Sequence, residues 1–229
     1  IDKTAVMPMA RALAFSKQEQ VHVHASDSLR MSIALSCNRS GNIAEATVHG
    51  HPVGVVIFGD LYQTGERNHK EDSLDRMLAC VLDGYVKNGL SVIRELRGDF
   101  VLAIWDGREK TFHISTDHFR THPIFYYEDD KKFVFASRMK SLMACPFPMQ
   151  RTINPRALAD VMAFSAITTD RTVFQEVKKL PPGHLLTYRD GRVSIQQYWD
   201  FNFLEPNQAS ESVLTQQLKA EFDDAVSVR

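Results

Sequence analysis

The sequence has almost no net charge, few cysteines and no long apolar run. Its 229 residues contain 27 Lys and Arg against 28 Asp and Glu, a formal net charge of −1, so no overall positive field favours nucleic-acid binding. No apolar run approaches the roughly 18 residues of a membrane-spanning helix. Residues 1–13 also lack the basic-then-apolar order of a signal peptide. We therefore expect a cytoplasmic protein with no nucleic-acid or membrane partner.

Only three cysteines occur, Cys37, Cys80 and Cys145, and they are far apart. An odd, scattered set argues against a disulfide framework and for a reducing compartment. Cys80 falls on the apolar side of a predicted helix, where we expect a core residue. Cys37 and Cys145 fall at the ends of predicted elements, and either could act as a nucleophile only beside a base. The P-loop, G-x-G-x-x-G and G-x-S-x-G patterns are absent.

The apolar spacing predicts an α+β protein with many strands and few helices. Residues 99–136 alternate β-formers with turns too short for crossover helices, which predicts an antiparallel meander. Residues 180–201 read as a hairpin that turns at Asp190-Gly191. We expect strands also at 21–25, 29–37 and 49–60, and helices at 7–15, 72–88 with Gly89 as C-cap, 137–145, from Asn154-Pro155, and 212–229.

Two His-x-His pairs, His22/His24 and His49/His51, could each direct two nitrogens to one metal if both residues lie on one strand. No third or fourth ligand stands at a telling spacing, so exposed strand-end histidines are the preferred interpretation. A metal-binding protein remains the least favoured alternative.

The segment from Leu96 to Phe201 contains, in this order, RGDFVLAIWD, TDHFRTHPIFYY, FVFASRMKSLM, TVFQEVKKLPPGHLLTY and QYWDF. In order and spacing these motifs resemble those of asparagine synthetase-type proteins. The Leu-Pro-Pro-Gly-His stretch is the most specific of these. Upstream, GDLY is similar to the family's N-G-E-(apolar)-Y-N, with Gly59, Asp60 and Tyr62 kept in kind.

The resemblance implies a class II, N-terminal-nucleophile glutamine amidotransferase domain with a four-layer αββα sandwich of two antiparallel sheets. In active members an N-terminal cysteine attacks the glutamine amide with its own α-amine as base. An Asn side chain and a Gly backbone N–H form the oxyanion hole. The released ammonia then reacts in a second, ATP-dependent domain.

Carried over to this sequence, that site is largely missing. The chain starts at Ile1 rather than Cys, and Phe58 occupies the position of the oxyanion Asn beside Gly59. Arg30 matches the Arg that holds the glutamine carboxylate, and Asp72 matches the Asp that holds its amine. The alternatives are a surface charge for Arg30 and a helix N-cap for Asp72.

Two further features complete this prediction. Asp60 would belong to a vestigial glutamine pocket together with Arg30, Gly59 and Asp72. Arg120 replaces the glycine of the family's RD-x-x-G turn, which leaves the conformation of that turn open.

The preferred hypothesis is a degenerate amidotransferase domain over residues 1–203, followed at 204–229 by a linker and the first helix of an ATP-pyrophosphatase (synthetase) domain. It would lack glutaminase chemistry and metal, and would serve as a docking platform. ATP and magnesium would bind to the synthetase domain, in the same polypeptide or in a partner chain, and a homodimer is left open. The apolar stripe Leu214/Leu218/Phe222/Val226 then needs a partner surface, unless it folds back. The alternative is an active glutamine-hydrolysing asparagine synthetase whose N-terminal Cys is missing from this chain.

Overall fold

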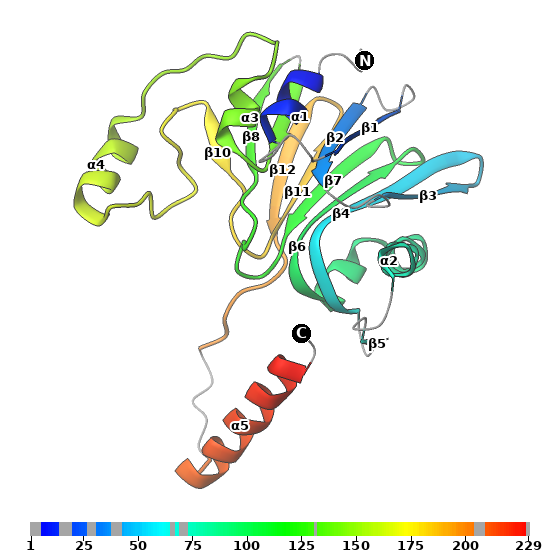
Figure 1. Cartoon of the computed structure of the whole chain (residues 1–229), viewed down its shortest axis with the longest axis vertical. Helices are drawn as coiled ribbons and strands as arrows, with labels where there is room; N and C mark the ends of the chain where they lie inside the picture. The colour runs from blue at the N-terminus through cyan, green and yellow to red at the C-terminus, as the bar shows by residue number, and fades with distance from the viewer. Residues whose placement is uncertain are drawn as a thin grey trace.

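The computed structural model describes residues 6–13, 20–26, 31–37, 43–64, 67–68, 73–130, 132–203 and 209–227, with the backbone alone at 20–26, 31–37 and 67–68. The helices are α1 (Met7–Leu13), α2 (Leu74–Asn88), a 3₁₀ helix (Gly89–Glu95), α3 (Met139–Met143), α4 (Pro155–Phe164) and α5 (Glu211–Ser227) (Figure 1). The strands are β1 (Gln20–Ser26), β2 (Met31–Cys37), β3 (Ile43–Val48), β4 (His51–Thr64), β5 (Arg67–Asn68), β6 (Leu96–Asp106), β7 (Thr111–Thr116), β8 (Phe125–Asp129), β9 (Lys132–Ala136), β10 (Val177–Lys179), β11 (His184–Arg189) and β12 (Arg192–Gln197). Within these ranges no helix is both long enough and apolar enough to cross a membrane.

The described strands form two principal antiparallel sheets. A seven-stranded sheet has the order β12-β11-β7-β6-β4-β3 with β5 paired to β4, and a three-stranded sheet has the order β10-β8-β9. Strands β1 and β2 pair with each other as a separate two-stranded sheet. The α+β class predicted from the sequence is confirmed.

The predicted meander over residues 99–136 is wrong in one respect, because it is divided between the two sheets. Strand β7 pairs with β6 in the larger sheet, whereas β8 pairs with β9 in the smaller one. Between them, residues 117–124 cross from one sheet to the other. The connection is too short for a crossover helix, as predicted, but it passes between two packed sheets instead of joining neighbouring strands.

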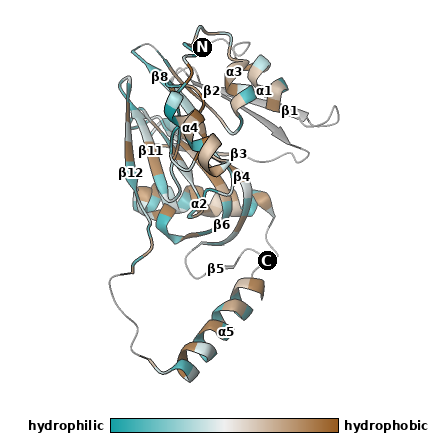
Figure 2. Ribbon diagram, turned by 90° about the vertical axis from the view of Figure 1, so that its left-hand side faces the viewer, coloured by the Kyte–Doolittle hydropathy of each residue, from teal (hydrophilic) through white to brown (hydrophobic). Residues whose placement is uncertain are grey.

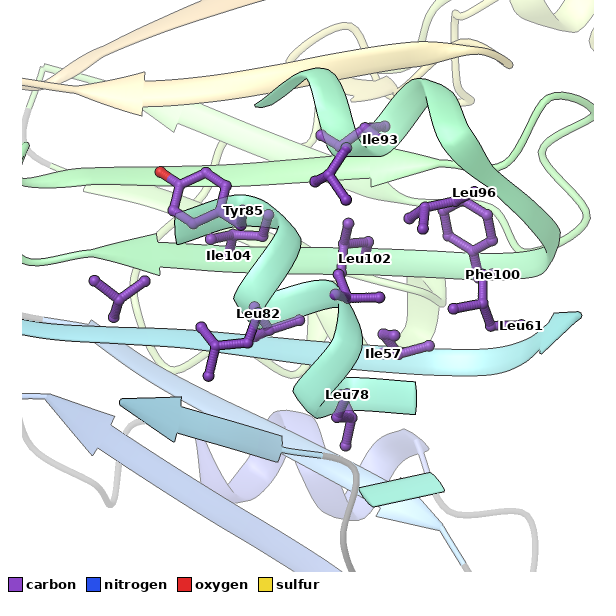
Figure 3. Packing of buried hydrophobic residues seen from close by; sticks show 14 of the residues in the cluster. Ile57, Leu61, Leu78, Leu82, Tyr85, Ile93, Leu96, Phe100, Leu102 and Ile104 are labelled. Carbon is purple, nitrogen blue, oxygen red and sulfur yellow. The ribbon is translucent and has the colours of Figure 1, made fainter. Parts of the chain in front are cut away.

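Three apolar clusters separate four layers. The first lies between α2 and one face of the larger sheet, where Figure 3 shows Leu78, Leu82 and Tyr85 of α2 directed at Ile57 and Leu102. The second lies between the two sheets, and the third between the smaller sheet and α1 with α3. Neighbouring residues of a strand serve different clusters because side chains alternate along it. The αββα sandwich predicted from the resemblance is thereby confirmed.

The alternation is clearest in β6 and β8. Leu102 faces α2 while Ala103 faces the smaller sheet. Tyr126 lies between the sheets while Tyr127 faces the outer helices. Both faces of each strand are therefore buried, and this accounts for their nearly continuous apolar sequence.

Local chemistry explains the element ends. Helix α2 begins after Ser73 as N-cap and ends at Gly89 with φ +62°, as predicted for the C-cap. Asn154 caps α4 through its side chain, as expected. Asp190 and Gly191 both have positive φ, which fits the tight turn predicted between β11 and β12.

A polar group lies buried at the end of the first cluster. Arg108 donates to both oxygens of Asp106, and the Tyr85 hydroxyl donates to the same carboxylate at 2.9 Å. Burial would raise the pKa of Asp106, but these hydrogen bonds hold it below its usual value. His113 on the neighbouring strand is buried beside Tyr85, and its Nδ1 lies 2.9 Å from the Thr187 hydroxyl.

Helix α5 lies apart from the sheets in both overall views (Figures 1 and 2). None of its described residues is buried. Arg97 of β6 approaches Asp224 of α5 at 3.7 Å, with both side chains more than half exposed. An ion pair of this kind contributes roughly 0–1 kcal/mol. The apolar stripe of α5 is therefore not folded back onto this domain.

Candidate functional site

Phe58 and Gly59 lie in the middle of β4, opposite Val101 and Phe100 of β6, at a position that we call the Phe58-Gly59 corner. Gly59 has φ +105°, a backbone conformation that side chains rarely adopt. A Cβ at this position would lie 2.0 Å from the carbonyl oxygen of Asp99 and 3.1 Å from the ring of His122. Only glycine fits here, so the backbone requires Gly59 whether or not its N–H ever meets an oxyanion.

The side chain of Phe58, next to Gly59, is half-buried. Its ring packs against the apolar cluster between the two sheets and meets the His122 ring edge-on, with 5.0 Å between ring centroids. A phenyl ring has no hydrogen-bond donor to offer an oxyanion. Phe58 therefore fills this position with an apolar ring.

Within the same GDLY segment, Tyr62 has a structural role. The Tyr62 hydroxyl donates to Asp99 Oδ2 at 2.8 Å, and the β4–β6 register shifts at Leu61/Gln63. Asp60 is exposed at the surface. Tyr62 therefore ties the end of β4 to β6.

The segment that crosses between the sheets brings His122 to the corner. The buried carboxylate of Asp117 accepts hydrogen bonds from the backbone N–H of Phe119 at 2.8 Å and of Thr121 at 3.0 Å. Arg120 lies between them with φ +53°. Arg120 thus adopts the left-handed conformation that suits the family's glycine, at a cost of about 1–2 kcal/mol.

The sequence assigned no role to His122, and its contact with Phe58 was therefore missed. No motif marks it, because the contact depends on where the crossing segment passes β4. Arg120 beside it is half-buried, and burial lowers the pKa of its guanidinium while Asp170 opposes that shift.

Several predicted site residues lie outside this corner or outside the described residues. Ile1, Arg30 and Asp72 fall outside the described residues. Cys145 is buried in the third cluster, where burial raises the pKa of its thiol, so it is a core residue and not an activated nucleophile. Cys80 is only partly buried and belongs to none of the three core clusters, contrary to the prediction.

The backbone at His49 and His51 does not fit the metal-binding alternative. His49 occupies the turn between β3 and β4 with φ +50°, while His51 begins β4. The two residues therefore do not share a strand face as the alternative assumed. Across the part of the chain that the structure describes, no group of three His, Cys, Asp or Glu could hold a metal ion. The side chains of His22 and His24 lie outside the described set.

The two packed antiparallel sheets form a sandwich in which the middle of β4 requires glycine at position 59. The sequence model of the glutamine amidotransferase domain family matches residues 66–199. This is more than half of the chain, and the chain belongs to that family. The match begins after the Phe58-Gly59 corner.

Curated relatives add detail to this assignment. Asparagine synthetase [glutamine-hydrolyzing] 3 of Bacillus subtilis is 23% identical over 190 residues, which cover 79% of this chain and 30% of the relative. Amidase chyE of Penicillium rubens is 30% identical over 211 residues, covering 87% of this chain and 30% of the relative. The chain thus spans about a third of the length of these proteins.

Among solved structures, the glutamine phosphoribosylpyrophosphate amidotransferase from B. subtilis in complex with ADP and GMP gives a TM-score of 0.43. It is 14% identical, and the match covers 71% of this chain and 32% of that chain.

Proposed function

We propose that this chain is the glutaminase-like domain of an ATP-dependent amide-forming enzyme, and that it lacks glutaminase activity. Its role is structural: it serves as a docking platform for the amide-forming domain. The carrying observation is the Phe58-Gly59 corner, where the position expected to donate to the oxyanion holds a packed aromatic ring.

The pattern of kept and lost features supports this proposal. Gly59 is required by the close approach of the Asp99 carbonyl, and Tyr62 is engaged in a hydrogen bond to the same residue. Phe58 offers no hydrogen-bond donor at this corner and packs against the apolar cluster between the sheets. Loss of a single oxyanion donor costs on the order of 10²–10³ in rate. This is the pattern of a fold maintained without selection on its chemistry.

The alternative is an active glutamine-hydrolysing asparagine synthetase. The printed name of the B. subtilis relative favours it, since that protein is called glutamine-hydrolyzing. The alternative requires another group to take over the role of the missing Asn donor. His122 is the nearest described candidate, because its ring touches both Phe58 and the position above Gly59.

Ammonia release from glutamine by the full-length protein separates the two. We expect none above background, and we expect His122→Ala to leave that result unchanged. Release with a turnover of roughly 1 per second or more, which is ordinary for enzymes, would refute the proposal. Loss of that release in His122→Ala would then identify the replacement donor.

ATP and magnesium belong, in this proposal, to the amide-forming domain and not to this chain. The glutamine-binding roles of Arg30 and Asp72 stay predictions. So does the assignment of residues 204–229 to a linker and the first helix of the next domain.

A further inference from the structure

Helix α4 stands out because its apolar side chains are in solvent. Seven of its ten residues in PRALADVMAF are apolar by sequence, yet only Ala157 is buried. Met162 is 82% exposed, Phe164 66% and Leu158 55%. Leu158, Val161 and Met162 are spaced i, i+3, i+4 and so share one helix face. A short helix this apolar is normally covered.

Although exposed, α4 is held in a defined conformation. The Asn154 side chain accepts from two backbone N–H groups of the first turn, and Pro155 follows it. Ser165 ends the helix in the left-handed conformation. Arg171 reaches Asp160 at 3.4 Å. A capped and braced helix loses little entropy on binding, and this suits a helix that enters an apolar groove.

A second unpartnered surface lies where the chain leaves the larger sheet. Phe119 is 70% exposed and Phe203 is 83% exposed. Together with their neighbours they form an array of rings in mutual contact, with centroids 4.8–5.9 Å apart: His118, Phe119, Trp199, Phe201 and Phe203. We call this array the aromatic strip. Aromatic residues and Met are enriched in protein interfaces, so both surfaces have interface composition.

The two surfaces are linked on one side of the molecule. Lys179 donates its backbone N–H to Asp170 and its Nζ to Ile167, which fastens the segment after α4 to β10. The charge of Asp170 also acts on Arg120, the residue next to Phe119 of the strip. In Figure 1, α4 and the segment leading to α5 both lie on the side opposite α2. Figure 2 views the molecule from that side, with α4 in front of the sheets.

We propose that α4 and the aromatic strip form one docking surface for the amide-forming domain of the same polypeptide, with α4 inserted into an apolar groove of that domain. This rests on the docking role proposed above. The strip contains residues of the segment that leads into α5, whose own apolar stripe is also exposed. More than two thirds of each relative's length lies outside the matched region, which leaves room for a domain of that size.

A covalently attached partner is favoured over a second copy for a physical reason. A domain joined by a short linker is present at an effective concentration in the millimolar range, so it outcompetes a free copy for the same surface. The surface is also asymmetric, with a projecting helix on one part and a flat aromatic strip on the other. A two-fold dimer would have to match each part with its own complement.

Photo-cross-linking in the full-length protein tests this inference. A benzoylphenylalanine at position 162 or 203 replaces a side chain that is more than four-fifths exposed, so folding is not disturbed. The control carries the same probe at Ala163, which points roughly 140° away from Leu158 around the helix. We expect the probes at 162 and 203 to cross-link to residues of the same polypeptide outside 1–229, several-fold more than the control.

Three results would overturn the inference: cross-links to a second copy, cross-links only within residues 1–229, or no excess over the control at 163. Ammonia release from glutamine is measured on the same preparation. Ammonia release together with the expected cross-links would refute the loss of glutaminase activity and leave the docking surface standing. If neither ammonia release nor the expected cross-links are found, the docking surface is refuted and the loss of glutaminase activity stands.

Discussion

Replacing His113 with Gln should remove a specific part of the acid sensitivity of this fold. His113 is 5% exposed. Burial, with Arg189 adding to it and Asp106 opposing, lowers the pKa of its imidazole from 6.5 to about 4. The neutral ring is therefore the form that the folded protein accommodates, and protonation favours the unfolded state.

The magnitude follows from the two pKa values. Because the folded pKa lies below the unfolded one, the contribution to stability is complete above pH 6.5 and is lost as the pH falls toward 4. The difference between a pKa of 6.5 and one of about 4 corresponds to a limiting loss of about 3 kcal/mol in the free energy of unfolding. Between pH 7.5 and pH 5 the loss attributable to His113 is about 2 kcal/mol.

Urea unfolding at pH 7.5 and at pH 5 measures this loss in the wild type and in His113→Gln. Gln keeps a partner for the Thr187 hydroxyl, which lies 2.9 Å from the His113 ring nitrogen, but does not titrate. Other acidic and histidine groups contribute equally to both proteins, so the difference between the two pH dependences isolates His113. Equal losses in the two proteins would refute the reasoning, since they would mean that the ring is protonated without penalty in the fold.

Three other substitutions test the corner and the buried polar group. Gly59→Ala should lower the free energy of unfolding by about 3 kcal/mol or more, because a strained φ and a backbone clash add. The control Gly50→Ala has a positive φ but open space around the new Cβ, so it should lower that free energy by only about 1 kcal/mol. Similar losses for the two variants in urea unfolding would show that the clash at Gly59 is relieved. Asp106→Ala should lower the free energy of unfolding, measured by thermal unfolding, by about 3 kcal/mol, because it leaves Arg108 without its buried partner. A decrease below about 1 kcal/mol would contradict that reasoning. Arg120→Gly should stabilise by roughly 1 kcal/mol, since relief of left-handed strain exceeds the added freedom of the unfolded chain; a lower urea midpoint would show that Arg120 makes contacts of greater value.

The errors of the sequence predictions concern strand pairing and the edge of a buried helix face. The sequence predicts the strands at 99–136 but not their division between two sheets, because alternation does not say which neighbour a strand pairs with. The metal alternative required His49 and His51 to share a strand face, whereas His49 lies in the turn before β4. Cys80 was assigned to the core from helix spacing alone, but it lies at the margin of the buried face.

The sequence by itself determined the element types and several of their caps and turns. These depend on local preferences and on motifs that neighbouring residues carry. Only the tertiary structure decided that Gly59 is required by the Asp99 carbonyl, that His122 contacts Phe58, and that α4 is left uncovered. Each of these depends on whether segments tens of residues apart approach one another, and no local pattern encodes that.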